Sequence, residues 1–228
     1  AGLAVYTAMS VDYAAWEQAG DNAEVATAIL ETADGGLSEI GDILERMYEL
    51  ASEASSGSVT DTERAYLDSE YQELVAQVDS IVNSTTYFDT SLLDGTYNQN
   101  FTVSADSSVA AIAVDLSAQA YDAASLGLAG DLTSATNAAT ELTAIEAAVT
   151  TVSSGRATVG ALMSRFDYAS GNIETAQTNL EAAMSVYMDA DIAELSAEQT
   201  ELGVKMDSAI QALSVSNENL EKLSRLLS

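Results

Sequence analysis

The stretch LSEIGDILERMYELASEASSGS, residues 37–58, decides the fold, because its apolar residues recur at alternating steps of three and four and then give way to Ser and Gly. This spacing predicts a helix with a heptad row that packs on another helix. Gly35 and Gly36 interrupt the row at a cost of about 1 kcal/mol each relative to Ala, so we expect neighbouring helices to supply stability. The row comprises Trp16, Ala19, Ala23, Ala26, Leu30, Ala33, Leu37, Ile40, Leu44, Met47, Ala51 and Ala54.

A second helix is predicted directly downstream. Residues 55–58 are a Ser/Gly turn, and Thr60 followed by Glu63 is a capping box that starts a helix. Its apolar row is Leu67, Tyr71, Leu74, Val78 and Ile81, and the pattern stops at Asn83. Because the connection is short, the two helices are predicted to form an antiparallel hairpin within residues 1–83.

Residues 84–133 have a different composition, rich in Thr, Ser, Asp and Gly. Apolar and polar residues alternate at Phe101 and Val103, and again at Ile112, Val114 and Leu116. This alternation predicts a small antiparallel β-hairpin region, and we expect a turn at 97–101.

Helical spacing returns after this region and predicts a long helix over 134–190 and a final amphipathic helix over 191–228. Arg156, Ser170 and Gln177 interrupt the first row, as polar residues that set register in coiled coils do. The final row is Leu202, Met206, Ala209, Leu213, Leu220, Leu223 and Leu227. The predicted fold is therefore mainly α, an elongated antiparallel coiled-coil or helical bundle with a small β-hairpin region in the middle of the chain.

Composition excludes several classes of function. The 228 residues include 36 acidic and 7 basic ones, for a formal charge of −29, and such a surface repels nucleic acid and anionic lipid. Self-association then requires contacts that avoid the acids, or salt that screens them over about 8–10 Å. The chain has no His or Cys, which removes imidazole bases and thiolate sites, and its lack of Pro favours uninterrupted helices. No apolar run reaches the roughly 18 residues of a membrane span, and no cationic signal-peptide start is visible.

Paired carboxylates are the remaining candidates for chemistry. Asp189 with Asp191, or Glu198 with Glu201, could in principle hold a hard cation, but they lack the spacing of a calcium loop. In so acidic a chain a solvated face is the favoured interpretation. We therefore predict no enzyme activity, no cofactor and no metal.

Five words along the chain together resemble bacterial flagellin, in the family's order. They are AGLAVYTAMS at 1–10, LSEIGDILERMYELASEASSGS at 37–58, YFDTSLLDG at 87–95, TVSSGRATVGALMSRFDYASGNIE at 151–174 and SVYMDADIAE at 185–194. The resemblance implies a homopolymeric subunit of the flagellar filament for swimming motility, secreted through the flagellar export channel and assembled outside the cell. It further implies terminal segments that pair as coiled coils lining the tube, with 191–228 as the inner-tube segment. Partners would be flagellar cap, junction and export-chaperone proteins, and the short middle region suggests that the variable outer domains are missing.

The family pattern also marks individual residues. Several dozen residues normally precede the AGLA word, so we expect either a trimmed chain or an uncaptured start. The word ERMYEL keeps Arg46 and Leu50 but has Tyr48 where a second Arg is common. In some flagellins this word, with an acid where Gln77 stands, is a docking site for a toll-like receptor; filament contact or helix surface is the favoured interpretation. Arg156 and Arg165 are expected to make structural ion pairs.

Three alternatives stay open. A hook-filament junction protein shares terminal coiled coils, but MDADIAE and SGRATVGALMSRF favour flagellin. A coiled-coil signalling protein, such as a chemoreceptor hairpin, fits poorly with the β region. A surface adhesin could use residues 95–130.

Overall fold

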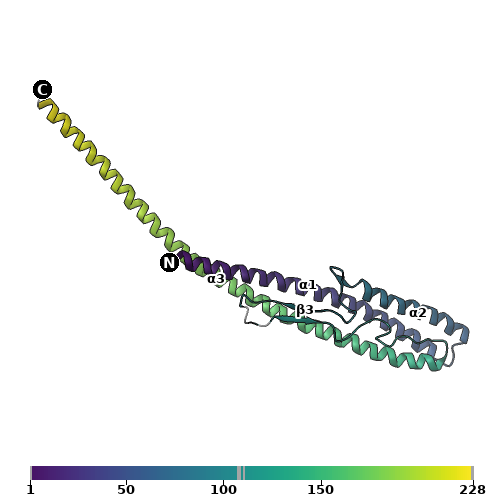
Figure 1. The fold of residues 1–228 in the computed structure, drawn as a ribbon. Coiled ribbons are helices and arrows are strands. Elements are labelled where there is room, and N and C mark those ends of the chain that lie inside the picture. Colours follow the sequence, from purple (N-terminus) through teal and green to yellow (C-terminus); the bar gives the residue numbers. More distant parts are fainter. Residues whose placement is uncertain (1, 107–108, 110, 227–228) are drawn as a thin grey trace. The chain divides into compact units, whose positions relative to one another are not determined.

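The computed structural model describes residues 2–106, 109 and 111–226, except for the side chains of residues 2, 189–194, 221 and 223–226. Its elements are α1 (Gly2–Ser55), α2 (Asp61–Ser84), β1 (Thr86–Tyr87), β2 (Thr90–Ser91), β3 (Asn98–Phe101), β4 (Ile112–Asp115) and α3 (Ala135–Leu226) (Figure 1). The prediction of a mainly α chain with a small β region is confirmed. The chain divides into two compact units, one of residues 15–176 and the other of residues 1–14 with 177–228. We call them the bundle unit and the terminal unit.

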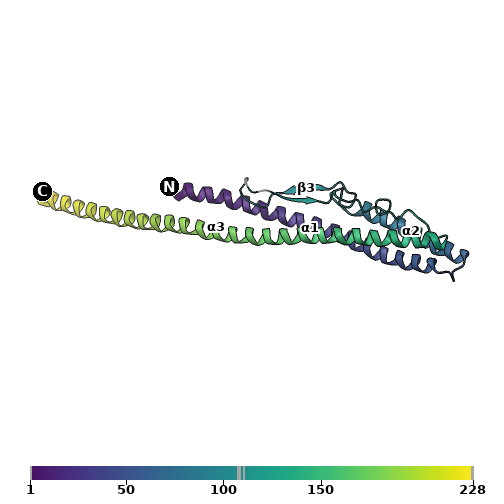
Figure 2. The ribbon, with the colours of Figure 1, turned by 90° about the horizontal axis from the view of Figure 1, so that it is seen from below.

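In the bundle unit α1, α2 and α3 lie side by side, and the strands lie along them (Figures 1 and 2). Cross-helix contacts fix the directions of the helices. Arg46 of α1 bonds to Glu70 of α2, and Arg64 of α2 reaches back to the carbonyl of Ala54, so α2 runs antiparallel to α1. On the other side, Arg156 meets Asp34. The predicted helical hairpin is therefore present.

The predicted apolar rows form the core of the bundle unit. From Ala19 to Ala54 every predicted member of the α1 row is buried. In α2, Tyr71 and Val78 are buried, and α3 contributes Ala138, Ile145, Val152, Val159, Phe166 and Ile173. Val149, which stands four residues after Ile145 and three before Val152, would belong to the same row by its spacing but is 41% exposed. Gly36 has a packing role, because a Cβ there would lie 2.6 Å from Thr85 Oγ1.

The turn between α1 and α2 follows the local sequence signals. α1 ends at Ser55, and the capping box is formed, with the Thr60 N–H donating to Glu63 Oε2 at 2.8 Å and the Glu63 N–H to Thr60 Oγ1 at 3.3 Å. The buried Arg64 adds a contact that no local signal predicts. Its Nε and Nη2 donate to the carbonyls of Ala54 and Ser56, at 2.9 and 3.0 Å. These bonds satisfy carbonyls at the end of α1 that have no partner within the helix.

The β region contains two small antiparallel pairs. β1 pairs with β2 across a two-residue turn in which Phe88 and Asp89 have φ of 45° and 61°. β3 pairs with β4, with Asn98 opposite Asp115 and Phe101 opposite Ile112. The predicted turn at 97–101 is wrong, because residues 98–101 are strand β3. Pairing with a strand that lies beyond the local window has overridden the turn-like composition.

Helix α3 continues through the predicted break near residue 190, so the final amphipathic helix is the distal part of the same 92-residue helix. The lack of Pro explains the continuity, since no residue of this segment forces the helix to stop. The division of the chain into segments 1–83, 84–133, 134–190 and 191–228 stays a prediction.

Candidate assembly surface

The distal part of α3 carries an apolar row with nothing packed on it in the described part of the terminal unit. Its members recur at steps of seven, four, seven and seven and are between 58% and 65% exposed. They are Leu195, Leu202, Met206, Leu213 and Leu220. Leu223 and Leu227, predicted for the same row, have side chains outside the described residues. A heptad row of this kind is the contact surface of a coiled coil.

The beginning of α1, in the same unit, is also apolar and open. Leu3 and Val11 are exposed, whereas Tyr6 and Met9 are half-buried. Helix propensity alone gives marginal stability to a helix in water, and soluble monomers rarely expose large contiguous apolar patches. The terminal unit therefore presents apolar surface of the kind on which helices pack.

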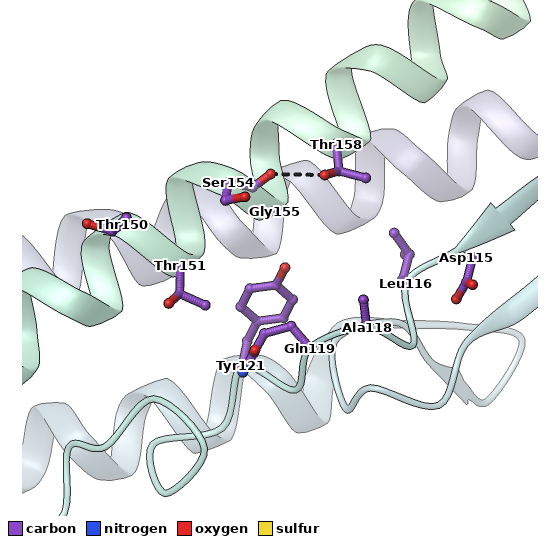
Figure 3. A pocket seen from close by; sticks show the side chains of 10 residues that line it. All are labelled: Asp115, Leu116, Ala118, Gln119, Tyr121, Thr150, Thr151, Ser154, Gly155 and Thr158. Atoms are coloured by element: carbon purple, nitrogen blue, oxygen red, sulfur yellow. Dashed lines mark hydrogen bonds between the residues drawn. The ribbon is translucent and has the colours of Figure 1, made fainter.

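In the bundle unit, close packing holds the loop before α3 against that helix. A groove of about 410 Å³ lies between this loop and α3, and the ring of Tyr121 points at Gly155 inside it (Figure 3). A Cβ at Gly155 would lie 2.1 Å from the Tyr121 hydroxyl oxygen, so only glycine fits. Burial raises the pKa of Tyr121. The one carboxylate of the lining, Asp115, accepts bonds from Ser117, which lower its pKa. The Tyr121 ring thus packs against Gly155, and the Asp115 carboxylate is bonded within its own loop.

Polar side chains of α2 hold the same loop by its backbone. Asp79 Oδ1 accepts the Ala123 N–H at 2.8 Å, and Asp68 Oδ1 accepts the Leu132 N–H at 2.8 Å. The result is a rigid cover over the helices.

A buried polar pair joins α2 to α3. Tyr71 Oη donates to Glu141 Oε2 at 2.7 Å, and both residues are buried. Burial, followed by the bond to Glu141, raises the pKa of Tyr71 well above its ordinary value. The Glu141 carboxylate also lies against Gly130, where a Cβ would have no room. The pair fixes the orientation of the two helices.

The residues singled out from the sequence have different surroundings. Arg46 is exposed and bonds to Glu70 at 2.7 Å and to Glu49 at 2.9 Å, which raises its pKa. Leu50 is 1% exposed and belongs to the core. Gln77 lies on the outer surface of α2.

The two arginines of α3 differ. Arg156 pairs with Asp34 through Nε–Oδ1 and Nη2–Oδ2 distances of 2.9 and 3.2 Å, and its pKa is raised mainly by the hydrogen bond to Asp34. Arg165 is exposed and has no acidic partner among the described residues. Sequence reasoning missed Arg64 and Glu141, which bond to Ala54 of α1 and to Tyr71 of α2.

Carboxylate pairs form no cation site in the part of the chain that the structure describes. The side chains of Asp189 and Asp191 lie outside the described residues. Glu198 is exposed, and Glu201 is bonded to Lys205 at 2.6 Å. Among the described residues, no helix is both long and apolar enough to cross a membrane.

Comparison with known proteins places this architecture in a family. Residues 1–98 match the bacterial flagellin N-terminal helical region, and residues 142–227 match the bacterial flagellin C-terminal helical region. Flagellin of Halalkalibacterium halodurans is 31% identical over 228 residues, covering all of this chain and 84% of the relative. Flagellin of Listeria innocua is 32% identical over 242 residues, with the same coverage of 100% and 84%.

A solved structure agrees. The crystal structure of Bacillus cereus flagellin superimposes with a TM-score of 0.62 at 30% identity, covering 72% of this chain and 94% of that one. Long packed helices with an open heptad row define a structural protein that assembles from copies. The chain belongs to the bacterial flagellin family and is a structural subunit of the flagellar filament. The junction, signalling and adhesin alternatives are not favoured.

Proposed function

We propose that the open apolar row of the terminal unit, from Leu195 to Leu220, is the surface through which subunits polymerise. The observation that carries this proposal is the exposure of five heptad positions, each more than half open to solvent. Covering them on a second helix removes apolar area from water, at roughly 25 cal/mol per Å² before ordering costs. In this proposal 191–228 is the inner-tube segment, and the bundle unit forms the outer wall.

Charge sets a condition on this assembly. With a formal charge of −29, copies of the chain repel each other until salt shortens the range of that repulsion to about 8–10 Å. We therefore expect the critical concentration for polymerisation to fall as ionic strength rises. Small differences in packing at such interfaces would give distinct filament shapes, provided that the interface is bistable.

The finer partners follow from the family and belong to the same proposal. We propose that export chaperones keep the terminal unit covered before secretion, that the cap folds subunits at the tip, and that junction proteins anchor the first ones. The apolar row supports this, since it would otherwise be exposed to water in transit. The finished polymer would lie outside the cell.

The receptor contact at Arg46, Leu50 and Gln77 is a separate, weaker proposal. Arg46 and Gln77 are accessible, but Arg46 already bonds to two acids, and the buried Leu50 would contribute only by supporting α1. A cell-based receptor assay that compares Arg46→Ala with the unsubstituted chain tests it. Equal responses would remove Arg46 from the contact.

Assembly is tested by seeding. Full-length product of the gene is mixed with short filament seeds at several salt concentrations and viewed by negative stain. We expect long tubes, and fewer of them at low salt. The variant Leu202→Gln/Leu213→Gln should remain monomeric, whereas the matched surface variant Thr62→Gln/Ser69→Gln on α2 should polymerise. Failure of the unsubstituted protein to grow under any condition, or growth of bounded caps only, would contradict the proposal.

A further inference from the structure

One stretch of α3 is nearly free of acids. Residues 147–173 contain Asp167, one of the chain's 36 acids, together with Arg156 and Arg165. Along α1 and α2 of the bundle unit, by contrast, acids recur every few residues. Copies of so acidic a protein repel one another. The acidic surface of one copy is repelled least where it approaches a segment of another copy that is poor in acids.

The outward side of this stretch is built for close approach. Its exposed residues are mostly small, and we call them the α3 face: Ala157, Ala161, Ser164, Arg165, Tyr168 and Asn172. They point away from the buried residues Val159, Phe166 and Ile173. Tyr168 is 80% exposed, and Tyr and Arg are the residue types that dominate the energetics of protein interfaces.

Arg165 supplies the charge argument. The bundle unit contains four cationic side chains, and three of them are paired: Arg46 with Glu70, Arg64 with Asp61 and Arg156 with Asp34. Arg165 has no acidic partner in the described part of the chain. Its guanidinium is therefore open to a carboxylate of another molecule.

The same unit presents such carboxylates on α1. The helix surface opposite the buried row carries exposed acids, which we call the α1 ridge: Glu24, Glu31, Asp42, Glu45, Glu49 and Glu53. Arg46 is the one cation within that span, and it is engaged by Glu49 and Glu70. Two ridges cannot meet without strong repulsion, and two α3 faces would set one Arg165 against the other.

We infer that, in the filament, the α3 face of one subunit packs on the α1 ridge of a second copy of this chain. This inference rests on the proposed polymerisation and names a contact of the bundle unit. The two surfaces differ, so the contact is heterologous: after two subunits bind, one retains a free ridge and the other a free face, and the chain of contacts continues. Arg165 lies among the ridge carboxylates, and Tyr168 covers the stems of the ridge side chains.

Cysteine cross-linking tests the geometry, because the chain has no Cys of its own. One preparation carries Ala161→Cys on the α3 face. Three others carry Ala28→Cys, Gly35→Cys or Ser52→Cys beside the ridge. Filaments grown from a mixture of face and ridge variants, treated with a short bis-maleimide, should give covalent dimers for at least one ridge position, and either variant alone should not.

Each other result has a distinct meaning. Dimers from Ala161→Cys filaments alone would show that the face meets itself, and intact filaments without mixed dimers would show that the two surfaces do not meet; both overturn the inference. Absence of filaments from the unsubstituted protein contradicts the proposed function instead. Cross-linking of monomers below the critical concentration serves as the background.

Charge reversal tests the role of Arg165. Arg165→Glu should raise the critical concentration about tenfold, and Arg165→Lys should leave it nearly unchanged. The control Ser69→Asp/Ser80→Asp reaches the same net charge through positions on α2 and should behave like the unsubstituted protein. Circular dichroism confirms that each variant is folded. Equal effects of the reversal and the control would mean that only net charge matters, and would overturn the inference.

Discussion

The bundle unit and the terminal unit both carry heptad rows of apolar residues, but the row is buried in the first and exposed in the second. Leu37 and Leu44 stand seven residues apart and are at most 1% exposed, whereas Leu213 and Leu220, also seven apart, are more than 60% exposed. Periodicity therefore predicts that a helix has a partner, but it does not say whether that partner belongs to the same chain. In the proposed polymer, the apolar row of the bundle unit is covered on folding and that of the terminal unit only on assembly.

The largest expected effect separates the two rows. Leu44→Ala should lower the free energy of unfolding by about 2–5 kcal/mol, because it leaves a cavity in a packed core. Leu213→Ala should change monomer stability by no more than about 0.5 kcal/mol, since its side chain is exposed. Chemical denaturation of monomers measures both.

The two Leu→Ala variants should rank in the opposite order in their effect on assembly. We expect Leu213→Ala to raise the critical concentration more than Leu44→Ala does, measured at a temperature where both variants are folded. Equal losses of monomer stability would mean that the distal row is covered within the monomer, and the comparison between the units would fail.

Two glycines of α3 sharpen the comparison. Gly155→Ala should destabilise the monomer by about 1–3 kcal/mol, because the new methyl group overlaps Tyr121. At Gly203 an added methyl group would meet no atom within 4 Å, so substitution by Ala should instead gain up to about 1 kcal/mol of helix stability. Thermal unfolding followed by circular dichroism shows whether each substitution lowers or raises the stability of the monomer. Destabilisation by both substitutions would show that Gly203 also has a close neighbour.

Two cationic side chains, Arg64 of the bundle unit and Lys205 of the terminal unit, should differ less in their contribution to stability. Arg64→Met removes the donor to the buried carbonyl end of α1 at Ala54 and one of the two donors to Ser56, whose carbonyl also accepts from the Val59 N–H, and should cost about 1–3 kcal/mol. Lys205→Met breaks an exposed pair with Glu201 and should cost about 0.3–0.5 kcal/mol. Urea unfolding of the two variants measures the difference. A cost at Arg64 no larger than at Lys205 would remove its capping role.

The smallest effect is a pH dependence confined to the bundle unit. Burial raises the pKa of Tyr71, Tyr97 and Tyr121 above the ordinary value of 10.0. Their neutral forms are favoured in the folded state, so the stabilisation is complete below pH 10.0 and is lost as the pH rises above it. Tyr121→Phe should flatten this decline in unfolding free energy relative to the unsubstituted protein, as pH-dependent urea unfolding would measure. An equally steep decline in the variant and the unsubstituted protein would contradict this role of Tyr121.

Much of the fold could be predicted because its signals are local. The heptad rows, the capping box of Thr60 and Glu63, and the short turn after Ser55 each lie within a few residues of sequence. The turn predicted at 97–101 failed because strand β3 is fixed by β4, beyond its local window. Arg64, Glu141 and the Tyr121–Gly155 contact were missed for the same reason, since each acts on a different element.

The candidate surface shows the same limit. The distal row could be recognised as amphipathic from its spacing, and the charge of −29 already required that contacts avoid acids. Which residues remain uncovered after folding could not be predicted. Leu50 and Arg46 belong to one word of sequence, yet one lies in the core and the other on the surface.

Spacing and composition alone are enough to predict a set of long, acid-rich helices whose apolar rows pack on other helices, because helix formation and charge are properties of the chain read a few residues at a time. The packed helices add which rows are closed within the bundle unit, which row is left open, and which arginine makes no ion pair among the described residues. Those outcomes depend on contacts between residues far apart in the chain, which periodicity does not encode.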